Sequence, residues 1–398
     1  MNKIYNRTGR IIFGRVKIEI INLIIHYIEE EIIGMSKEDL RIVFMGTPEF
    51  AVESLKRLVE GGYNVVAVVT QPDKPVGRHQ DTLQPSQVKQ YAVEHGLPVL
   101  QPVKMKDPEF LEQLRSYQAD LQVVVAFRML PEVVWAMPKY GTFNVHAALL
   151  PQYRGAAPIN WAVINGEKET GVTTFFLDHQ IDTGRIIMQK RFPIPEEADV
   201  EYVYDGLMHL GAEIALETID ALIASDGNLP SMAQEELIGE GVELKPAPKI
   251  FKDTCRIDFH KPAKQVHDFI RGLSPYPGSW TEIKRKEPVV VFMDDEAEGG
   301  ADFKMPDPTA HPAQKKSTAK VQVMKIFKSF VSDEYRGAAP VGSLRVEGDH
   351  LQVACLDYWL DIYQLQLAGK KRMEAKDFLN GMKDIAYYEC QKSESEDF

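Results

Sequence analysis

The fold of the first half of the chain is decided by the stretch RIVFMGTPEFA at residues 41–51. Its apolar run from Arg41 to Met45 is typical of a buried strand, and Gly46 ends that strand. Thr47-Pro48 then predicts a helix N-cap followed by a proline at the first helical position. Apolar residues follow at helical spacing, so the stretch predicts a strand joined directly to a helix.

The same alternation of strand and helix continues along the chain. Residues 64–70 and 121–126 are further apolar runs, and residues 85–94 have helical character. Continuous apolar runs are typical of parallel strands that are covered by helices on both faces. We therefore expect an α/β fold with a doubly wound, mostly parallel, Rossmann-like sheet, whose ligands bind beyond the carboxyl ends of its strands.

The length of 398 residues predicts two domains. A long helix expected over 199–225 closes a catalytic domain at residues 35–225, and residues 226–252 lack periodicity, as a linker would. Short strands separated by turns then predict a small OB-like β-barrel domain at residues 253–398. A Pro-rich acidic segment at residues 293–318 is expected to be a mobile loop between two barrel strands.

Residues 1–34 are rich in isoleucine, but charged and polar residues interrupt every apolar run before it reaches membrane-spanning length. We expect neither a membrane segment nor a secretory signal. Because Met35 and the polar residues after it look like an ordinary protein start, residues 1–34 are interpreted as an appended or mis-started segment. The alternative is a real amphipathic helix that packs on the catalytic domain.

Composition and charge exclude several classes of protein. Hydrophobic residues make up 44% and charged residues 26%, which indicates a folded chain rather than a disordered one. The 46 Lys and Arg against 58 Asp and Glu give a net charge of −12, so contact with nucleic acid must come from a local basic surface. The 3 cysteines fit neither a disulfide framework nor a zinc site, which favours the reducing cytoplasm, and no metal is expected.

Two polar residues mark the expected ligand-binding edge of the sheet. Residues 141–146, GTFNVH, end a predicted strand, and the two-residue period of a strand places Asn144 and His146 on one face. A lone histidine at a strand end is more often structural than catalytic. The turn between predicted strands at 172–177 and 185–189 carries Asp182, whose carboxylate can reach the imidazole or can simply cap its own turn.

Several segments together resemble the methionyl-tRNA formyltransferase family. They are RIVFMGTPEFA, TQPDKPVGR (70–78), FNVHAALLPQYRGAAPI (143–159), ETGVT (169–173), IDTG (181–184) and LQLAGKKRMEAKDFLNG (365–381). Their combination is far more specific than any one of them and spans about residues 40 to 385. The resemblance implies a translation-initiation enzyme that transfers the formyl group of 10-formyltetrahydrofolate to the α-amino group of methionyl initiator tRNA. It also implies that Asn144, His146 and Asp182 are the catalytic residues.

Formyl transfer makes chemical sense of these residue types. Attack of an amine on the formyl carbonyl builds negative charge on the carbonyl oxygen, and the amide of Asn144 is a fixed, neutral donor. His146 can donate to the same oxygen when protonated, or take a proton from the amine when neutral. Asp182 would orient the imidazole ring and stabilise its charged form.

Backbone groups and apolar walls are expected to bind the folate co-substrate. The residues expected at that site are Phe127, Leu130, Ala148, Leu149, Leu150 and Pro151. The chain departs from the usual family pattern at Ala148, where Ser is common, at Gln180, where Gly is usual, and at Phe127-Arg128, where Tyr-Gly is usual. These departures concern the folate loops and leave the three catalytic positions intact.

Contact with tRNA is expected from local basic groups, namely Lys74, Arg78, Lys370, Lys371 and five lysines between residues 315 and 328. Each alone is more often solvated surface, but clusters without acidic neighbours suit phosphate contacts. In the resemblance, Arg78 matches the arginine of the first loop that reaches the tRNA acceptor end.

Two other functions stay open on the residues alone. A formyltransferase acting on a small amine, such as a sugar nucleotide or glycinamide ribonucleotide, would share the Asn, His and Asp without needing the basic barrel. A noncatalytic tRNA- or folate-binding protein is the other alternative, and the intact catalytic positions argue against it. We expect a monomer without a membrane partner.

Overall fold

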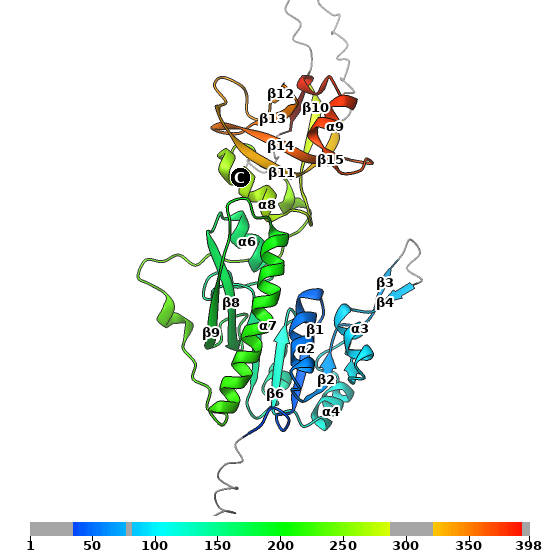
Figure 1. Ribbon diagram of the computed structural model, residues 1–398, viewed down its shortest axis with the longest axis vertical. Coiled ribbons are helices and arrows are strands. Elements are labelled where there is room, and N and C mark those ends of the chain that lie inside the picture. The colour runs from blue at the N-terminus through cyan, green and yellow to red at the C-terminus, as the bar shows by residue number, and fades with distance from the viewer. Residues whose placement is uncertain (1–34, 77–81, 287–320, 392–398) are drawn as a thin grey trace, which may run out of the picture. The chain divides into compact units, whose positions relative to one another are not determined.

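The computed structural model describes residues 35–76, 82–286 and 321–391 (Figure 1). These residues form two compact units. The first contains the described residues up to Ile159, together with Glu169–Ile194 and Tyr202–Pro248. The second contains Asn160–Lys168, Pro195–Glu201 and the described residues from Lys249 onward.

The first unit is built on a seven-stranded sheet with the order β5-β2-β1-β6-β7-β8-β9. Its parallel strands are β5 (Val99–Leu100), β2 (Val65–Val69), β1 (Ile42–Gly46), β6 (Leu121–Val125) and β7 (Thr142–His146). The last two strands, β8 (Glu169–Phe176) and β9 (Ile186–Pro193), run antiparallel to their neighbours. The mostly parallel sheet predicted from the apolar runs is confirmed.

Helices cover both faces of this sheet. On one face lie α2 (Glu49–Glu60) and α7 (Val200–Ala224), which are joined where the Tyr204 hydroxyl accepts from the backbone of Phe50. On the other face lie α4 (Pro108–Ser116) and the short α5 (Glu132–Trp135), which pack on the side chains that β1, β2 and β6 point toward them. The remaining helices that precede residue 200 are α3 (Gln87–Glu94), beside α2, and α6 (Pro158–Ile164).

The helix after β1 begins one residue later than the sequence predicts. Pro48 occupies the N-cap position and makes no side-chain cap hydrogen bond, so Thr47 precedes the cap. The Thr47 hydroxyl instead accepts from the backbone N–H of Gln71, at 3.4 Å. The neighbouring chain after β2 offers this partner, so the threonine links two strand ends rather than capping a helix.

The second unit is a nearly closed antiparallel barrel, as predicted. Its main sheet has the order β12-β13-β14-β11-β10-β16, with β15 (Met373–Glu374) paired to β14. These strands are β10 (Ser279–Arg285), β11 (Gln322–Tyr335), β12 (Leu344–Glu347), β13 (His350–Ala354), β14 (Tyr358–Leu367) and β16 (Tyr388–Cys390). Ser343 bridges to Glu389, and the Cys390 N–H donates to the Gly342 oxygen at 2.8 Å, which brings the two edge strands together.

Two helices contribute side chains to the core of this barrel. The helix α8 (Ala263–Gly272) contributes Val266 and Ile270 to the core, and α9 (Ala375–Gly381) contributes Phe378. The segment expected at residues 1–34 and the loop expected at residues 293–318 lie outside the described residues.

The structure also describes the cysteines, the possible metal ligands and the lengths of the apolar helices. All three cysteines are buried and free. Among the described residues, no group of three or more His, Cys, Asp or Glu side chains is placed to hold a metal ion. No helix in this part of the chain combines the length and apolarity needed to span a bilayer.

Candidate active site

The strand β7 places Asn144 and His146 on the same face of the sheet, at its carboxyl end. Asn144 lies beside Val124 of β6, whose side chain belongs to the core under α4 and α5. Val145 points to the other face, where it lies against α7 at Gly211. The predicted two-residue period is therefore observed, and both polar side chains face the α4 and α5 side of the sheet.

The histidine is held by the loop that follows it. His146 is 6% exposed, and its Nε2 lies 2.9 Å from the backbone oxygen of Tyr153. Because a carbonyl oxygen can only accept, Nε2 carries the proton in the neutral ring, and Nδ1 is then the basic nitrogen. Nδ1 faces the carboxylate of Asp182, whose Oδ2 is 3.8 Å away.

The turn that carries Asp182 has an unusual backbone. Asp182 adopts a left-handed conformation with φ of 55°, and its Oδ2 accepts from the Gly155 N–H at 2.9 Å. A Cβ on Gly184 would lie 1.6 Å from the Phe176 oxygen, so only glycine fits there. The turn thus lies tightly against β8, and it brings the carboxylate to the imidazole.

Asn144 differs from His146 and Asp182 in its hydrogen bonding. Within the part of the chain that the structure describes, its side-chain amide makes no hydrogen bond. The residue is half-buried, so the amide stays accessible. An amide fixed on a strand and left unpaired is suited to donate to an oxygen atom of a bound molecule.

A segment that the sequence interprets as a linker completes this site. Met232 pairs with Ile186 at the start of β9, and the Ala247 oxygen accepts from the backbone N–H groups of Ala156 and Ala157. Gln234, which is fully buried, donates to the backbone oxygens of Asp182 and Gly184, both at 2.8 Å. Sequence reasoning missed Gln234, because nothing in its neighbourhood distinguishes it from a solvated loop residue.

The loop at residues 147–151 is fixed from β8 and β9. The Thr173 hydroxyl donates to the Ala148 oxygen at 2.6 Å and accepts from the Leu150 N–H at 3.1 Å. Gln189 donates to the Leu150 oxygen at 2.7 Å. The Leu150 side chain is buried, and cis-Pro151 follows it. Leu149, half-buried, packs over Gly171.

The loop at residues 126–131 is held by its side chains instead. Leu130 is buried in the core below the loop, and Phe127 packs against that core. Arg128 donates to the backbone oxygens of Pro102 and Val103, and burial lowers the pKa of its guanidinium below the usual value. Within the described residues, the backbone groups of residues 126–130 pair with no other backbone group. Any contact that Leu130 makes with a ligand must therefore come from its backbone.

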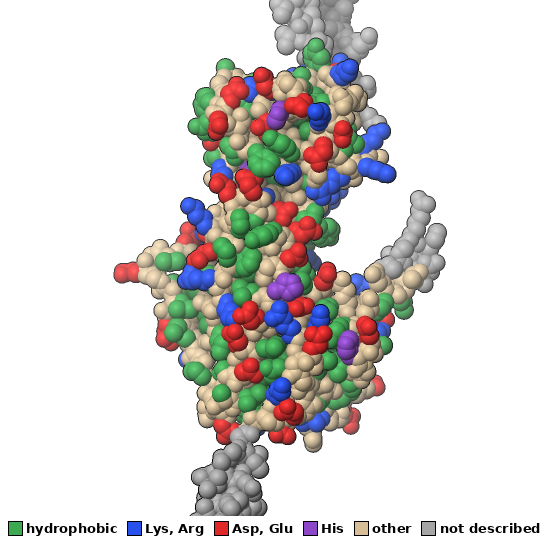
Figure 2. Space-filling view, viewed as in Figure 1, with side chains coloured by type: hydrophobic (Ala, Val, Ile, Leu, Met, Phe, Trp, Pro, Cys, Tyr) green, Lys and Arg blue, Asp and Glu red, His purple; other side chains and the backbone are tan. Residues whose placement is uncertain are grey.

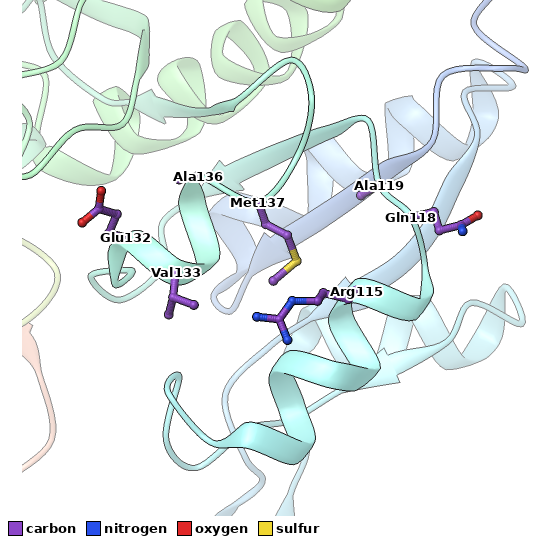
Figure 3. Close-up of a pocket in the computed structure, with 7 residues that line it drawn as sticks. All are labelled: Arg115, Gln118, Ala119, Glu132, Val133, Ala136 and Met137. Atoms are coloured by element: carbon purple, nitrogen blue, oxygen red, sulfur yellow. The ribbon is translucent and has the colours of Figure 1, made fainter.

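A separate hollow of about 510 Å³ lies between the C-terminal end of α4 and α5 (Figure 3). It is lined by Arg115, Gln118, Ala119, Glu132, Val133, Ala136 and Met137. None of the predicted site residues lines it.

The residues expected to contact tRNA are placed in two regions. Lys74 is exposed on β3 (Lys74–Val76), which pairs with β4 (Thr82–Gln84), and Arg78 lies outside the described residues. The loop is anchored at Asp73, where hydrogen bonds from Lys89 (2.6 Å) and Gln101 (2.7 Å) lower the pKa of the carboxyl group.

In the second unit, Lys370 and Lys371 are exposed in the turn between β14 and β15. Figure 2 shows basic side chains on the side of the barrel where this turn projects. Lys325 and Lys328 lie on β11, and Lys325 donates to the Pro277 oxygen at 3.0 Å. The other three lysines of that cluster, Lys315, Lys316 and Lys320, are outside the described residues.

Comparison with protein families matches nearly the whole described chain. Residues 40–219 match the family described as formyl transferase, and residues 249–302 and 303–383 match the formyl transferase C-terminal domain. A protein of Parabacteroides distasonis named methionyl-tRNA formyltransferase is 56% identical over 358 residues, which are 89% of this chain and 99% of that protein. A protein of Porphyromonas gingivalis with the same name is 45% identical over 348 residues, 87% of this chain and 97% of that protein.

Solved structures show the same fold at lower identity. The N-formyltransferase from Helicobacter canadensis, solved with folinic acid and dTDP-3-aminofucose, has a TM-score of 0.52 at 20% identity, over 82% of this chain and 99% of that chain. HypX from Aquifex aeolicus, solved with tetrahydrofolic acid, has a TM-score of 0.51 at 16% identity, over 86% of this chain and 47% of that chain. By its sequence identity to the curated relatives and by its two matching domains, the chain belongs to the methionyl-tRNA formyltransferase family.

Proposed function

We propose that the protein transfers the formyl group of 10-formyltetrahydrofolate to the α-amino group of methionyl initiator tRNA. The single observation that carries this proposal is the meeting of three side chains at the carboxyl end of β7. Asn144, whose amide makes no hydrogen bond to the described residues, stands on the same face as His146, and the Asp182 carboxylate faces the basic nitrogen of that histidine. The family supplies the identity of the substrates.

The reaction needs a donor for the oxygen and an acceptor for a proton. When the amine attacks the formyl carbon, negative charge builds on the formyl oxygen, and the Asn144 amide donates to it. His146 takes the amine proton at Nδ1, because Nε2 is already bound to the Tyr153 oxygen. The imidazolium then lies against the Asp182 carboxylate, which stabilises its charge. The bond between the formyl carbon and the folate nitrogen then breaks, the imidazolium gives its proton to that nitrogen, and tetrahydrofolate leaves.

The folate is proposed to lie between the loops at residues 126–131 and 147–151. The first loop offers backbone N–H and C=O groups that pair with no other backbone group of the described residues. At the second loop the half-buried Leu149 supplies an apolar surface, and the buried Ala148, Leu150 and Pro151 belong to a loop that β8 and β9 fix in place. A flat heterocycle with several donors and acceptors fits such a combination of open backbone and apolar wall.

The charged tRNA is proposed to use Lys74 and Arg78 near its acceptor end and Lys370 and Lys371 on the barrel. These lysines are exposed, as phosphate contacts require. Because initiator tRNA is used on cytoplasmic ribosomes, we propose that the protein acts in the cytoplasm. We also propose that it acts as a monomer. The small-amine alternative is not favoured, because the curated relatives at 45% identity or more bear the tRNA-specific name.

One assay tests the substrates. Labelled formyl groups on 10-formyltetrahydrofolate are offered to charged initiator tRNA, uncharged tRNA and amino sugars. We expect transfer to charged initiator tRNA alone. Transfer to the amino sugars but not to charged tRNA would establish the small-amine alternative, and transfer to nothing would favour a noncatalytic binding protein.

A further inference from the structure

We propose that Gln234 is a positioning residue for formyl transfer, which holds the Asp182 turn in the conformation that presents its carboxylate to His146. The inference rests on the catalytic role proposed above for Asp182. It extends that role to a residue that lies beyond the catalytic domain expected from the sequence. Gln234 begins the short 3-10 helix Gln234–Leu237, and its side chain is fully buried.

The side-chain amide of Gln234 uses both its N–H groups and its oxygen in hydrogen bonds. Its two N–H groups donate to the backbone oxygens of Asp182 and Gly184, both at 2.8 Å. Its oxygen accepts twice from Arg154, at 3.0 Å from Nε and at 2.7 Å from a terminal nitrogen. Glutamine is the residue type that this arrangement needs, because it must donate twice and accept at the same place.

These contacts connect the loop at Arg154 and Gly155 to both the carboxylate and the backbone of Asp182. Arg154 precedes Gly155, and the Gly155 N–H binds the Asp182 carboxylate at 2.9 Å. Gln234 links the side chain of Arg154 back to the backbone of Asp182. The carboxylate and the backbone of one residue are therefore fixed by two adjacent positions of the loop that also holds His146.

The backbone of Asp182 needs such support. A φ of 55° lies in the left-handed region, which a residue other than glycine occupies only when its surroundings specify it. Asn and Asp adopt the left-handed region more readily than most residues. A turn without supporting contacts would still populate other backbone conformations as well. Because Gln234 binds the carbonyl oxygens of Asp182 and of Gly184, it fixes the peptide group that follows Asp182 and the peptide group that follows Gly184.

The test replaces Gln234 by methionine, which has similar length and no donor or acceptor of comparable strength. We expect kcat for charged tRNA to fall roughly 10²-fold, as for a reacting group displaced by about 1 Å. The KM values for folate and tRNA should change less than about threefold, since substrate contacts stay in place. The matched control is Gln122→Met, which removes a fully buried glutamine on β6 that accepts from Thr142.

A double-mutant cycle separates positioning from general loosening. In an Asp182→Asn background the Gln234→Met loss should shrink to less than about threefold, because there is no charged carboxylate left to position. An equal loss in both backgrounds, an effect confined to KM, or the same kcat loss for Gln122→Met would overturn the inference. Near-native turnover of Asp182→Asn alone would refute the proposed role of Asp182 and this inference together.

Arg154→Met provides a second approach if Gln234→Met does not fold. This variant removes only the donors to the Gln234 oxygen and leaves both bonds to the Asp182 turn. We expect a smaller kcat loss, roughly tenfold, that again vanishes in the Asp182→Asn background. A loss that persists undiminished in that background would show that Arg154 and Gln234 do not act through the Asp182 carboxylate.

Discussion

The loops after β6 and β7 follow neighbouring parallel strands, yet they are built in different ways. After β7, hydrogen bonds from Thr173, Gln189 and the segment around Ala247 satisfy the backbone at close intervals. After β6, the loop is held by the buried Leu130 and by Arg128, while its backbone groups at 126–130 pair with no other backbone group of the described residues.

The difference separates two tasks. A group that must meet a transition state gains from a fixed setting, because small displacements of reacting groups are costly. A loop that binds a polar heterocycle needs open donors and acceptors instead. The β7 loop therefore suits catalysis and offers the folate a fixed surface, and the β6 loop suits hydrogen bonding to the folate. Substitutions of the groups that fix the catalytic residues should lower kcat, and substitutions of the groups that hold the β6 loop should raise the KM for folate.

The largest effect is expected from Asp182→Asn. The amide has the shape of the carboxylate but lacks the charge that stabilises protonated His146, and such losses reach about 10⁴ in kcat in a serine protease. Folate binding and the melting temperature should stay near wild type. Single-turnover formyl transfer, a folate titration and a thermal melt measure the three quantities. Near-native turnover would refute the proposed role of Asp182.

Asn144→Ala is expected to cost roughly 10²–10³ in kcat, because removing one oxyanion donor has that magnitude. Since Asn144 makes no hydrogen bond within the described residues, its removal leaves no internal partner unsatisfied. Steady-state kinetics against folate and tRNA concentration give the measurement. A change in KM alone would instead identify Asn144 as a binding residue.

Arg128→Met tests the other loop. Loss of its hydrogen bonds to Pro102 and Val103 should free the 126–131 loop and raise the KM for folate roughly tenfold, with kcat little changed. The control is Arg336→Met in the second unit, where Arg336 likewise donates to two backbone oxygens. If kcat fell while KM stayed constant, the proposed division between the two loops would be wrong.

Arg78→Ala should leave both loops unaffected and weaken tRNA binding. Removing one phosphate contact lowers the log–log salt slope of binding by about 0.7–0.9. Arg78→Lys should recover only part of the loss, because lysine lacks the planar fork of arginine. Titrations of tRNA at several salt concentrations, paired with folate binding, make the measurement. Parallel slopes and equal formylation rates would show that Arg78 is a solvated loop charge.

The smallest effect is expected from deleting residues 1–34. If the segment is appended, activity should not change and the melting temperature should move less than about 2–4 °C, the shift that corresponds to about 1 kcal/mol in a domain of this size. Differential scanning calorimetry of the shortened and full chains provides the measurement. A larger fall would support the alternative of a packed amphipathic helix.

The sheet of the first unit was predictable because its strands are buried on both faces. The run at β1 is apolar, the run at β6 is apolar except for Gln122, and burial is complete along both strands. The barrel strands leave a weaker signal, since buried and exposed residues mix along β11. The position of Thr47 was not predictable, because its partner Gln71 comes from a different strand end.

The same contrast applies to the site. Asn144 and His146 share a face because the two-residue period is local to one strand, and Asp182 stands in a motif that carries its own turn signals. Gln234 binds oxygens that lie 52 and 50 residues earlier in the chain. No local pattern encodes such a contact, because it forms only when the sheet brings β9 beside the returning segment.

The long return of the segment at residues 232–247 to the catalytic loops has a consequence during synthesis. Translation proceeds from the N-terminus, so all seven strands of the sheet and α7 emerge from the ribosome before Gln234 and Ala247 do. A nascent chain that ends just after α7 already holds Asn144, His146 and Asp182 but lacks the segment that fastens their loops. Chemical competence is thus acquired only after the sheet is complete, when the segment up to residue 247 has been added.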